Sequence, residues 1–308
     1  MDNYTARLRI AHMERSRRDH DRNLRLPLLA AVRQTRRWSL PVIATLAVAA
    51  LAVLPGRSGV VAVAHATAQP RPTIVLIHGA WADASSWSGV VRRLQRDGYT
   101  VDAPPNPLRG VPGDSAYLAS FLTSVTGPVV LVGHSYGGMV ITNAAIGNAN
   151  VKALVYVDAY IPVQGETIAG LTGAKPGFCL ASKPADVFNV APYPGASTGD
   201  ADLYVKPALF PQCFANGLPA EKGAVLASTQ RPLAASAIAE PSGAPAWTTI
   251  PSWSLIGTDD NIIPPAEQRV MSQRAHAHIT EIRAPHLSMI AHPEVVTDVI
   301  LQAVRATG

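Results

Sequence analysis

From residue 73 onward, short runs of β-branched and apolar residues alternate with stretches of helical periodicity. This alternation is typical of a parallel α/β sheet, and the continuous apolar runs indicate strands that helices cover on both faces. The expected strands are residues 73–77, 100–103, 128–132, 153–157, 253–256 and 278–282. The expected helices lie around residues 87–97, 115–125, 137–146, 265–275 and 293–306. The sequence therefore predicts an α/β fold with a mostly parallel sheet of about six strands.

The alternation stops between Ile161 and Ile250, where Pro, Gly, Ala and Ser are frequent and we see no strand pattern. A segment of this length is too long to be a connecting loop. We expect an inserted lid over one end of the sheet, at about residues 161–250.

Residues 133–137, with the sequence Gly-His-Ser-Tyr-Gly, directly follow an apolar strand and precede a helix-like run. Strand, tight turn and helix form the context of a nucleophile elbow, which makes a chance match of the pattern improbable. Ser135 must take a strained backbone there, and Gly133 and Gly137 remove side chains that would collide across the turn. The start of the helix directs N–H groups to the place where an oxyanion would form.

A serine nucleophile needs a base, and the base is expected on a loop after the last strand. His286 follows the strand that ends at Ile282 by four residues, and it is the favoured base. His292 opens the final helix and fits a cap or surface role better. His276 and His278 lead into the strand and are expected at the surface.

The acid that orients the base is expected after the penultimate strand, and Asp260 is the favoured residue there. It stands three residues after Gly257 and four before Pro264. Its neighbour Asp259 is one alternative. Asp158, after an earlier strand, is another, and it could instead close a strand end.

The loop after the first strand should supply a second oxyanion donor. The Ala80 N–H is the expected partner of the Tyr136 N–H in the oxyanion hole. Trp81 and Trp87 could line the substrate pocket, although either tryptophan could equally belong to the core. His78 is expected to be a structural hydrogen-bonding residue rather than a catalytic one.

Residues 73–306 resemble the α/β-hydrolase-fold serine hydrolases, of the small kind that includes plant methyl esterases and hydroxynitrile lyases. The elbow at 133–137, the loop at 78–80, the acid loop at 257–264 and His286 carry this resemblance. It implies hydrolysis of a small-molecule carboxylic ester, with an acyl-enzyme on Ser135 that water releases.

Three positions differ from those of other enzymes with this fold, and these differences disfavour two of the possible activities. The hydroxynitrile lyases of this group usually have Thr where Gly79 stands and Lys where Leu287 stands, so cyanohydrin cleavage is disfavoured. Haloalkane dehalogenases need Asp at position 135. Acyl transfer or perhydrolysis on the same triad stays open, and so does a non-catalytic protein that binds a small ligand under the lid.

Cys179 and Cys213 both lie in the expected lid. They could form a disulfide in an exported protein, and two separate buried thiols are about as plausible. We find no metal-ligand spacing and no Gly-rich phosphate loop after a strand, so no metal, cofactor or nucleotide is expected.

The net charge of +5 is unevenly distributed. Residues 1–39 hold ten arginines and four acidic residues, whereas residues 40–308 hold 16 basic and 17 acidic residues. Nucleic acid is therefore not an expected partner, although the overall charge alone would suggest one.

The N-terminal segment has the order of an export signal: the basic region, an apolar stretch at 40–54 and the small-residue tripeptide at 66–68. An arginine pair at 36–37 resembles a twin-arginine signal, except that Ser39 stands where an aromatic would follow. Residues 1–68 are thus expected to be a cleaved signal peptide of a secreted or periplasmic protein, with residues 69–308 as the hydrolase domain. The alternative is an uncleaved anchor, which would be the only membrane contact.

Overall fold

The computed structural model describes residues 70–180 and 183–307. The expected signal peptide or anchor in residues 1–68 lies outside these residues. None of the helices in the described ranges is both long enough and apolar enough to span a bilayer.

A six-stranded sheet forms the centre of the fold, in the order β2-β1-β3-β4-β8-β9. Every neighbouring pair in it is parallel. The strands are β1 (Thr73–Ile77), β2 (Val101–Asp102), β3 (Val129–His134), β4 (Val151–Val157), β8 (Ser252–Gly257) and β9 (His278–Ile282). The prediction of an α/β fold with about six parallel strands is confirmed. The second strand is shorter than expected, and the third continues to His134.

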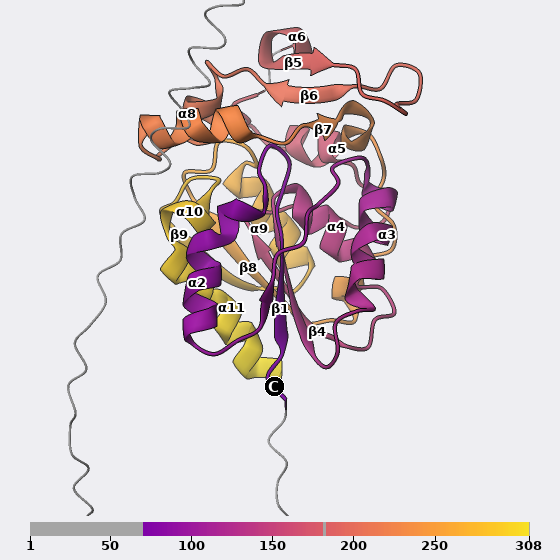
Figure 1. Cartoon of the computed structure of the whole chain (residues 1–308), viewed down its shortest axis with the longest axis vertical. Helices are drawn as coiled ribbons and strands as arrows, with labels where there is room; N and C mark the ends of the chain where they lie inside the picture. The colour runs from indigo at the N-terminus through magenta and orange to yellow at the C-terminus, as the bar shows by residue number, and fades with distance from the viewer. Residues whose placement is uncertain (1–69, 181–182, 308) are drawn as a thin grey trace, which may run out of the picture. The chain divides into compact units, whose positions relative to one another are not determined.

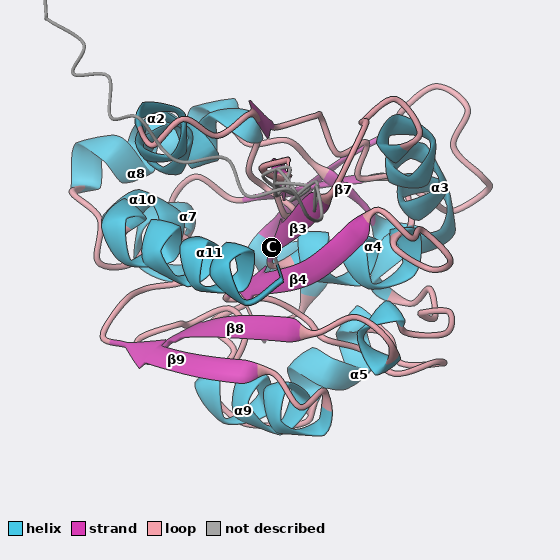
Figure 2. Ribbon diagram, turned by 90° about the horizontal axis from the view of Figure 1, so that it is seen from below, coloured by secondary structure: helices cyan, strands magenta, loops and turns pink. Residues whose placement is uncertain are grey.

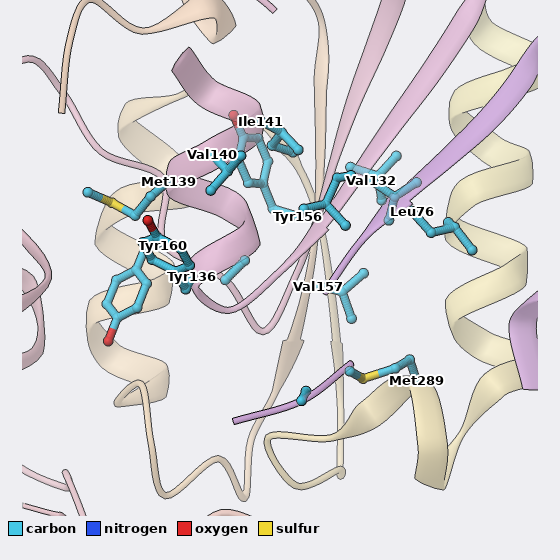
Figure 3. Packing of buried hydrophobic residues seen from close by; sticks show 14 of the residues in the cluster. Leu76, Val132, Tyr136, Met139, Val140, Ile141, Tyr156, Val157, Tyr160 and Met289 are labelled. Atoms are coloured by element: carbon cyan, nitrogen blue, oxygen red, sulfur yellow. The ribbon is translucent and has the colours of Figure 1, made fainter. Parts of the chain in front are cut away.

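Helices cover both faces of this sheet (Figure 2). On one face lie α2 (Ser88–Arg96) and α11 (Pro293–Thr307), and on the other lie α3 (Val111–Leu122), α4 (Tyr136–Ala144) and α9 (Pro265–Arg274). The strands β1, β3 and β4 are almost completely buried, which explains their continuous apolar sequences. Figure 3 shows Leu76, Val132 and Val157 of these strands with side chains of α4, all within one hydrophobic core.

The expected lid follows β4 and lies above the main sheet in Figure 1. Contrary to expectation, it contains strands: β5 (Phe188–Ala191), β6 (Asp202–Val205) and β7 (Leu233–Ala234) form an antiparallel sheet. Its helices are α5 (Ile168–Gly173), α6 (Pro184–Val187), α7 (Phe210–Cys213) and α8 (Ala220–Thr229). The strands have only two to four residues each, which is too short for a visible alternation in the sequence.

Short helical turns complete the described structure. They are the 3₁₀ helices η1 (Ala84–Trp87), η2 (Ala235–Ile238) and η3 (Ala246–Thr248), and the short helix α10 (Ser288–Ala291). Because α10 begins two residues after His286, it belongs to the loop that carries the expected base.

Candidate active site

Ser135 forms the sharp turn between β3 and α4. Its backbone angles, φ 53° and ψ −123°, lie in a region that residues other than glycine rarely adopt. A Cβ on Gly133 would lie 2.6 Å from the carbonyl oxygen of Gly137. A Cβ on Gly137 would lie 2.6 Å from the carbonyl oxygen of Ile77. Both glycines are therefore required by the turn that presents the Ser135 hydroxyl at the end of the sheet.

The structure brings together Ser135, His286 and Asp260, the three residues expected to be catalytic. The His286 ring contacts the other two side chains, with Nε2 at 3.0 Å from Ser135 Oγ and Nδ1 at 2.9 Å from Asp260 Oδ2. All three residues are buried, although Ser135 and His286 are 151 positions apart in the chain. This is the arrangement of a nucleophile, a general base and an orienting acid.

Hydrogen-bond donors surround the Asp260 carboxyl group. Oδ1 accepts the backbone N–H groups of Ile262 at 2.7 Å and Ile263 at 3.0 Å. Oδ2 accepts the side-chain amide of Gln268 at 2.7 Å in addition to the His286 contact. Burial raises the pKa of Asp260 to about 8, and these donors oppose part of that shift because they stabilise the carboxylate. A carboxylate here selects the His286 tautomer with its proton on Nδ1, so that Nε2 can accept the Ser135 proton.

Burial also sets the charge of His286, because it lowers the pKa of this imidazole to about 3. The ring is therefore neutral near pH 7 and is able to act as a base. Sequence analysis missed the amide donor Gln268, since a glutamine eight residues after Asp260 carries no motif signal.

The alternative acids do not contact the base. Asp259 is half exposed and pairs with Arg283 at 3.2 Å. Asp158 is completely buried, but its carboxyl group accepts the N–H groups of Gly257 at 2.7 Å and Ser288 at 3.3 Å. Burial and then the nearby Asp260 charge raise the pKa of Asp158, so Asp158 is the more readily protonated of the two carboxyls.

The alternative base His292 lies away from this cluster. Its side chain is 40% exposed, and its Nδ1 lies 3.6 Å from Glu294. Of the other histidines, His78 hydrogen-bonds the backbone of Gly79 and Asn106 and has the structural role expected for it.

Two backbone N–H groups are positioned as the sequence suggests for an oxyanion hole. Ala80 and Tyr136 line the same cavity as Ser135, and neither N–H donates to another protein atom in the described ranges. Tyr136 is the first residue of α4, so the helix dipole adds positive potential there. Its phenol donates to the buried Asp114 at 2.7 Å, which anchors the residue that supplies one donor. No sequence motif marks Asp114, and sequence analysis missed it.

Ser135 lines a cavity of about 380 Å³ beneath the lid. This volume is within the range of small-molecule sites. None of the described residues that line it carries a charge. Its apolar wall includes Ile168 of α5, Phe178, Leu180, Phe188, Leu233 and Ile262.

The two tryptophans suggested for the pocket differ. Trp81 lines the cavity and stacks on Phe188, with ring centroids 5.5 Å apart. Trp87 does not line it: this side chain is completely buried beneath the elbow, edge-on to the His134 ring. The pocket role suggested for Trp87 is therefore wrong, because the residue ends η1 and faces the core.

The two cysteines form a disulfide, with Cα atoms 5.6 Å apart. The backbone N–H of Cys179 also donates to the carbonyl of Asn261, the residue after the catalytic acid candidate, at 2.7 Å. At the other end of the bridge, Phe214 follows Cys213 and packs against the His286 ring, with centroids 5.2 Å apart. The bridge thus links the cavity wall to both loops that carry the acid and the base.

Within the two described ranges, no group of three or more His, Cys, Asp or Glu side chains is arranged to hold a metal ion.

Comparisons with known proteins agree with this architecture. A carbendazim hydrolyzing esterase of Nocardioides sp. (strain SG-4G) is 34% identical over 110 residues, which is 32% of this chain and 46% of that protein. The chain thus spans about half the length of that relative. The alpha/beta hydrolase nvfD of Aspergillus novofumigatus is 26% identical over 254 residues, covering 76% of this chain and 96% of that protein.

The fold is shared with solved structures. A pyrethroid hydrolase from Sphingobium faniae JZ-2 superposes with a TM-score of 0.60 at 21% identity, over 76% of this chain and 98% of that one. The family model described as "Alpha/beta hydrolase family" matches residues 74–299, which is most of the chain. The chain therefore belongs to the alpha/beta hydrolase family.

Proposed function

We propose that this protein hydrolyses uncharged, largely apolar carboxylic esters through an acyl-enzyme on Ser135. The observation that carries the proposal is the contact chain from Asp260 through His286 to Ser135 Oγ, together with the apolar cavity that Ser135 lines. Two of the relatives named above, an esterase and a pyrethroid hydrolase, support ester cleavage as the reaction class.

The reaction begins when His286 Nε2 takes the Ser135 proton as Oγ attacks the ester carbonyl carbon. The carbonyl oxygen becomes negatively charged and accepts the N–H groups of Ala80 and Tyr136. The bond to the alcohol oxygen then breaks, and the imidazolium returns its proton to the leaving alcohol. In the second half, His286 takes a proton from water, the hydroxide attacks the acyl carbon, and the Ser135 oxygen leaves with that proton.

The cavity argues for the substrate class. An ionised substrate would lose its hydration, and the described walls offer no opposite charge to compensate for it. An apolar ester gains free energy from the same transfer. We therefore expect neutral esters with apolar groups to be cleaved more efficiently than esters that carry a carboxylate or an ammonium group.

Turnover of phenyl butanoate tests the proposal, with Ser135→Ala as the comparison. The expected result is a loss of about 10³–10⁶-fold in kcat, because triad residues act as a unit. A serine-directed phosphonate should label the wild-type protein at Ser135. Wild-type protein that neither turns over esters nor reacts with the phosphonate would instead indicate a binding protein. An ester product formed with added alcohol would indicate acyl transfer.

We also propose that the hydrolase domain is exported and that residues 1–68 are removed. The basic, apolar and small-residue order of this segment supports the proposal, as does the Cys179–Cys213 disulfide, since disulfides persist in oxidising compartments. N-terminal sequencing of protein from the producing cells should begin near residue 69. A first residue before Leu40 would contradict it and favour the anchor.

A further inference from the structure

Two residues with hydroxyl groups line the cavity besides Ser135 and Tyr136. They are Tyr160, which follows β4, and Thr172 of α5, and their hydroxyl groups are hydrogen-bonded to each other at 2.7 Å. Both residues are at most 5% exposed. The two hydroxyl groups thus form a small polar region in a cavity lining that is otherwise mainly apolar.

The other polar side chains of the cavity are already engaged. The Trp81 indole N–H donates to the Leu203 carbonyl at 2.8 Å. The Tyr136 phenol donates to Asp114 at 2.7 Å. Neither group is free to bind a ligand.

The hydroxyl pair, by contrast, has a hydrogen to spare. Tyr160 and Thr172 have one hydroxyl hydrogen each, and their mutual bond uses one of the two. The second has no acceptor among the residues that the structure describes. Burial raises the pKa of Tyr160, so its hydroxyl keeps its proton.

The position of Tyr160 is fixed relative to the nucleophile. Its backbone N–H donates to the carbonyl oxygen of Ser135 at 3.3 Å. Its own carbonyl oxygen packs against Gly138 of the elbow helix, so closely that a Cβ there would collide with it. A hydroxyl held in this way has a set separation from the reacting carbonyl.

We propose that the Tyr160–Thr172 hydroxyl pair is a specificity subsite that donates a hydrogen bond to a neutral oxygen of the substrate. The acceptor is an ether or carbonyl oxygen separated from the scissile ester. This inference rests on the proposed function, and it narrows the substrate class to apolar esters with one such second oxygen. An all-carbon analogue leaves the spare hydrogen unpaired in the complex, which is how a buried polar group discriminates.

A panel of matched esters tests the subsite. One set is phenyl alkanoates in which a single methylene is replaced by an ether oxygen at successive positions, each compared with its all-carbon chain. The second set makes the same replacement in the alcohol of alkyl acetates. The rate of proton release on hydrolysis, measured by titration at constant pH, gives kcat and KM for every ester in the two sets.

Wild-type protein is expected to prefer the ether ester at one position by about tenfold in kcat/KM, as one neutral hydrogen bond allows. The double variant Tyr160→Phe/Thr172→Val should reduce this preference to about one, and mainly through KM, because the oxygen lies away from the reacting carbonyl. Each single variant leaves one hydroxyl whose hydrogen is unused, so it should retain part of the preference and lose less than the double variant. Hydrolysis of the all-carbon esters should not fall and should rise towards that of the ether esters, because the double variant no longer leaves a buried hydrogen unpaired.

Tyr156→Phe is the matched control. Tyr156 and Thr142 form a second buried hydroxyl pair, at 2.9 Å, and neither residue lines the cavity at Ser135. In Figure 3, the Tyr156 ring lies against Ile141 of α4 within the core. This variant removes the same group at a similar cost in stability and should leave the ether preference intact.

Three results would overturn the inference. The first is ester cleavage by wild-type protein with no ether preference at any position, which leaves the proposed function standing. The second is a Tyr160→Phe variant that slows all-carbon and ether esters equally, which indicates a structural role. The third is no cleavage of any ester, which overturns the proposed function together with the subsite.

Discussion

Asp158 gives the sharpest test of how the two catalytic loops are held. Its carboxyl group accepts Gly257 N–H from the loop that carries the acid and Ser288 N–H from the loop that carries the base. Its own backbone has φ 45°, a conformation that Asp and Asn tolerate better than Ala. One buried side chain therefore holds both loops through hydrogen bonds.

Asp158→Ala should lower the free energy of unfolding by about 3–8 kcal/mol. Each N–H left without an acceptor costs about 1–3 kcal/mol, and alanine in the left-handed conformation costs about 1–2 kcal/mol more. Asp158→Asn keeps an acceptor for the 2.7 Å bond but turns an NH₂ group towards Ser288, so its loss should be about 1–3 kcal/mol. Urea unfolding followed by circular dichroism gives both values.

Activity separates anchoring from acid function. Asp158→Asn should retain ester hydrolysis within about tenfold, because the protonated Asp158 carboxyl and the amide are both neutral. Asp260→Asn should lose about 10³–10⁴-fold, since it favours the wrong His286 tautomer. If Asp158→Ala were as stable as the wild type, the anchoring argument would be wrong. If Asp158→Asn were as inactive as Asp260→Asn, then Asp158 would be the orienting acid.

Three further predictions concern the base, the elbow and the lid. Because burial lowers the pKa of His286 to about 3, the base stays neutral as the pH falls, and kcat/KM measured across pH should decline only below pH 6.5. Gly138→Ala should lower the free energy of unfolding by more than about 2 kcal/mol in urea titrations, because the new methyl collides with backbone. Serine at both Cys179 and Cys213 should lower it by about 2–4 kcal/mol, given the 34-residue separation of the two ends.

Each of these predictions has its own control. Half-maximal kcat/KM at or above pH 6.5 in folded protein would contradict the lowered His286 pKa. Gly113→Ala, in the first turn of α3 where the new methyl meets no atom within 4 Å, should instead stabilise by about 0.4–1 kcal/mol, and equal effects at the two glycines would refute the packing argument. Equal stability of wild-type protein with and without a reductant would contradict the disulfide prediction.

The central sheet and the elbow could be predicted because their signals are local. A buried parallel strand needs an unbroken apolar run, and the turn at Ser135 needs glycine two residues away on each side. His286 and Asp260 could be placed for a related reason. In a parallel sheet the ends of successive strands meet at one edge, so position in the chain predicts proximity.

The rest depended on contacts between distant segments. Asp260 and Asp158 both follow strands, and only packing decides that one faces the base while the other holds backbone. Trp87 and Trp81 are equally apolar and near in sequence, yet one faces the core and the other the cavity.

The sequence by itself therefore determined the α/β architecture, the nucleophile and its expected partners, through short patterns that each backbone segment requires. Only the tertiary structure decided the lid sheet, the cavity and the Tyr160–Thr172 pair. Those features form where segments distant in the sequence come into contact. A local sequence pattern therefore does not predict which hydroxyl or indole will line the cavity between them.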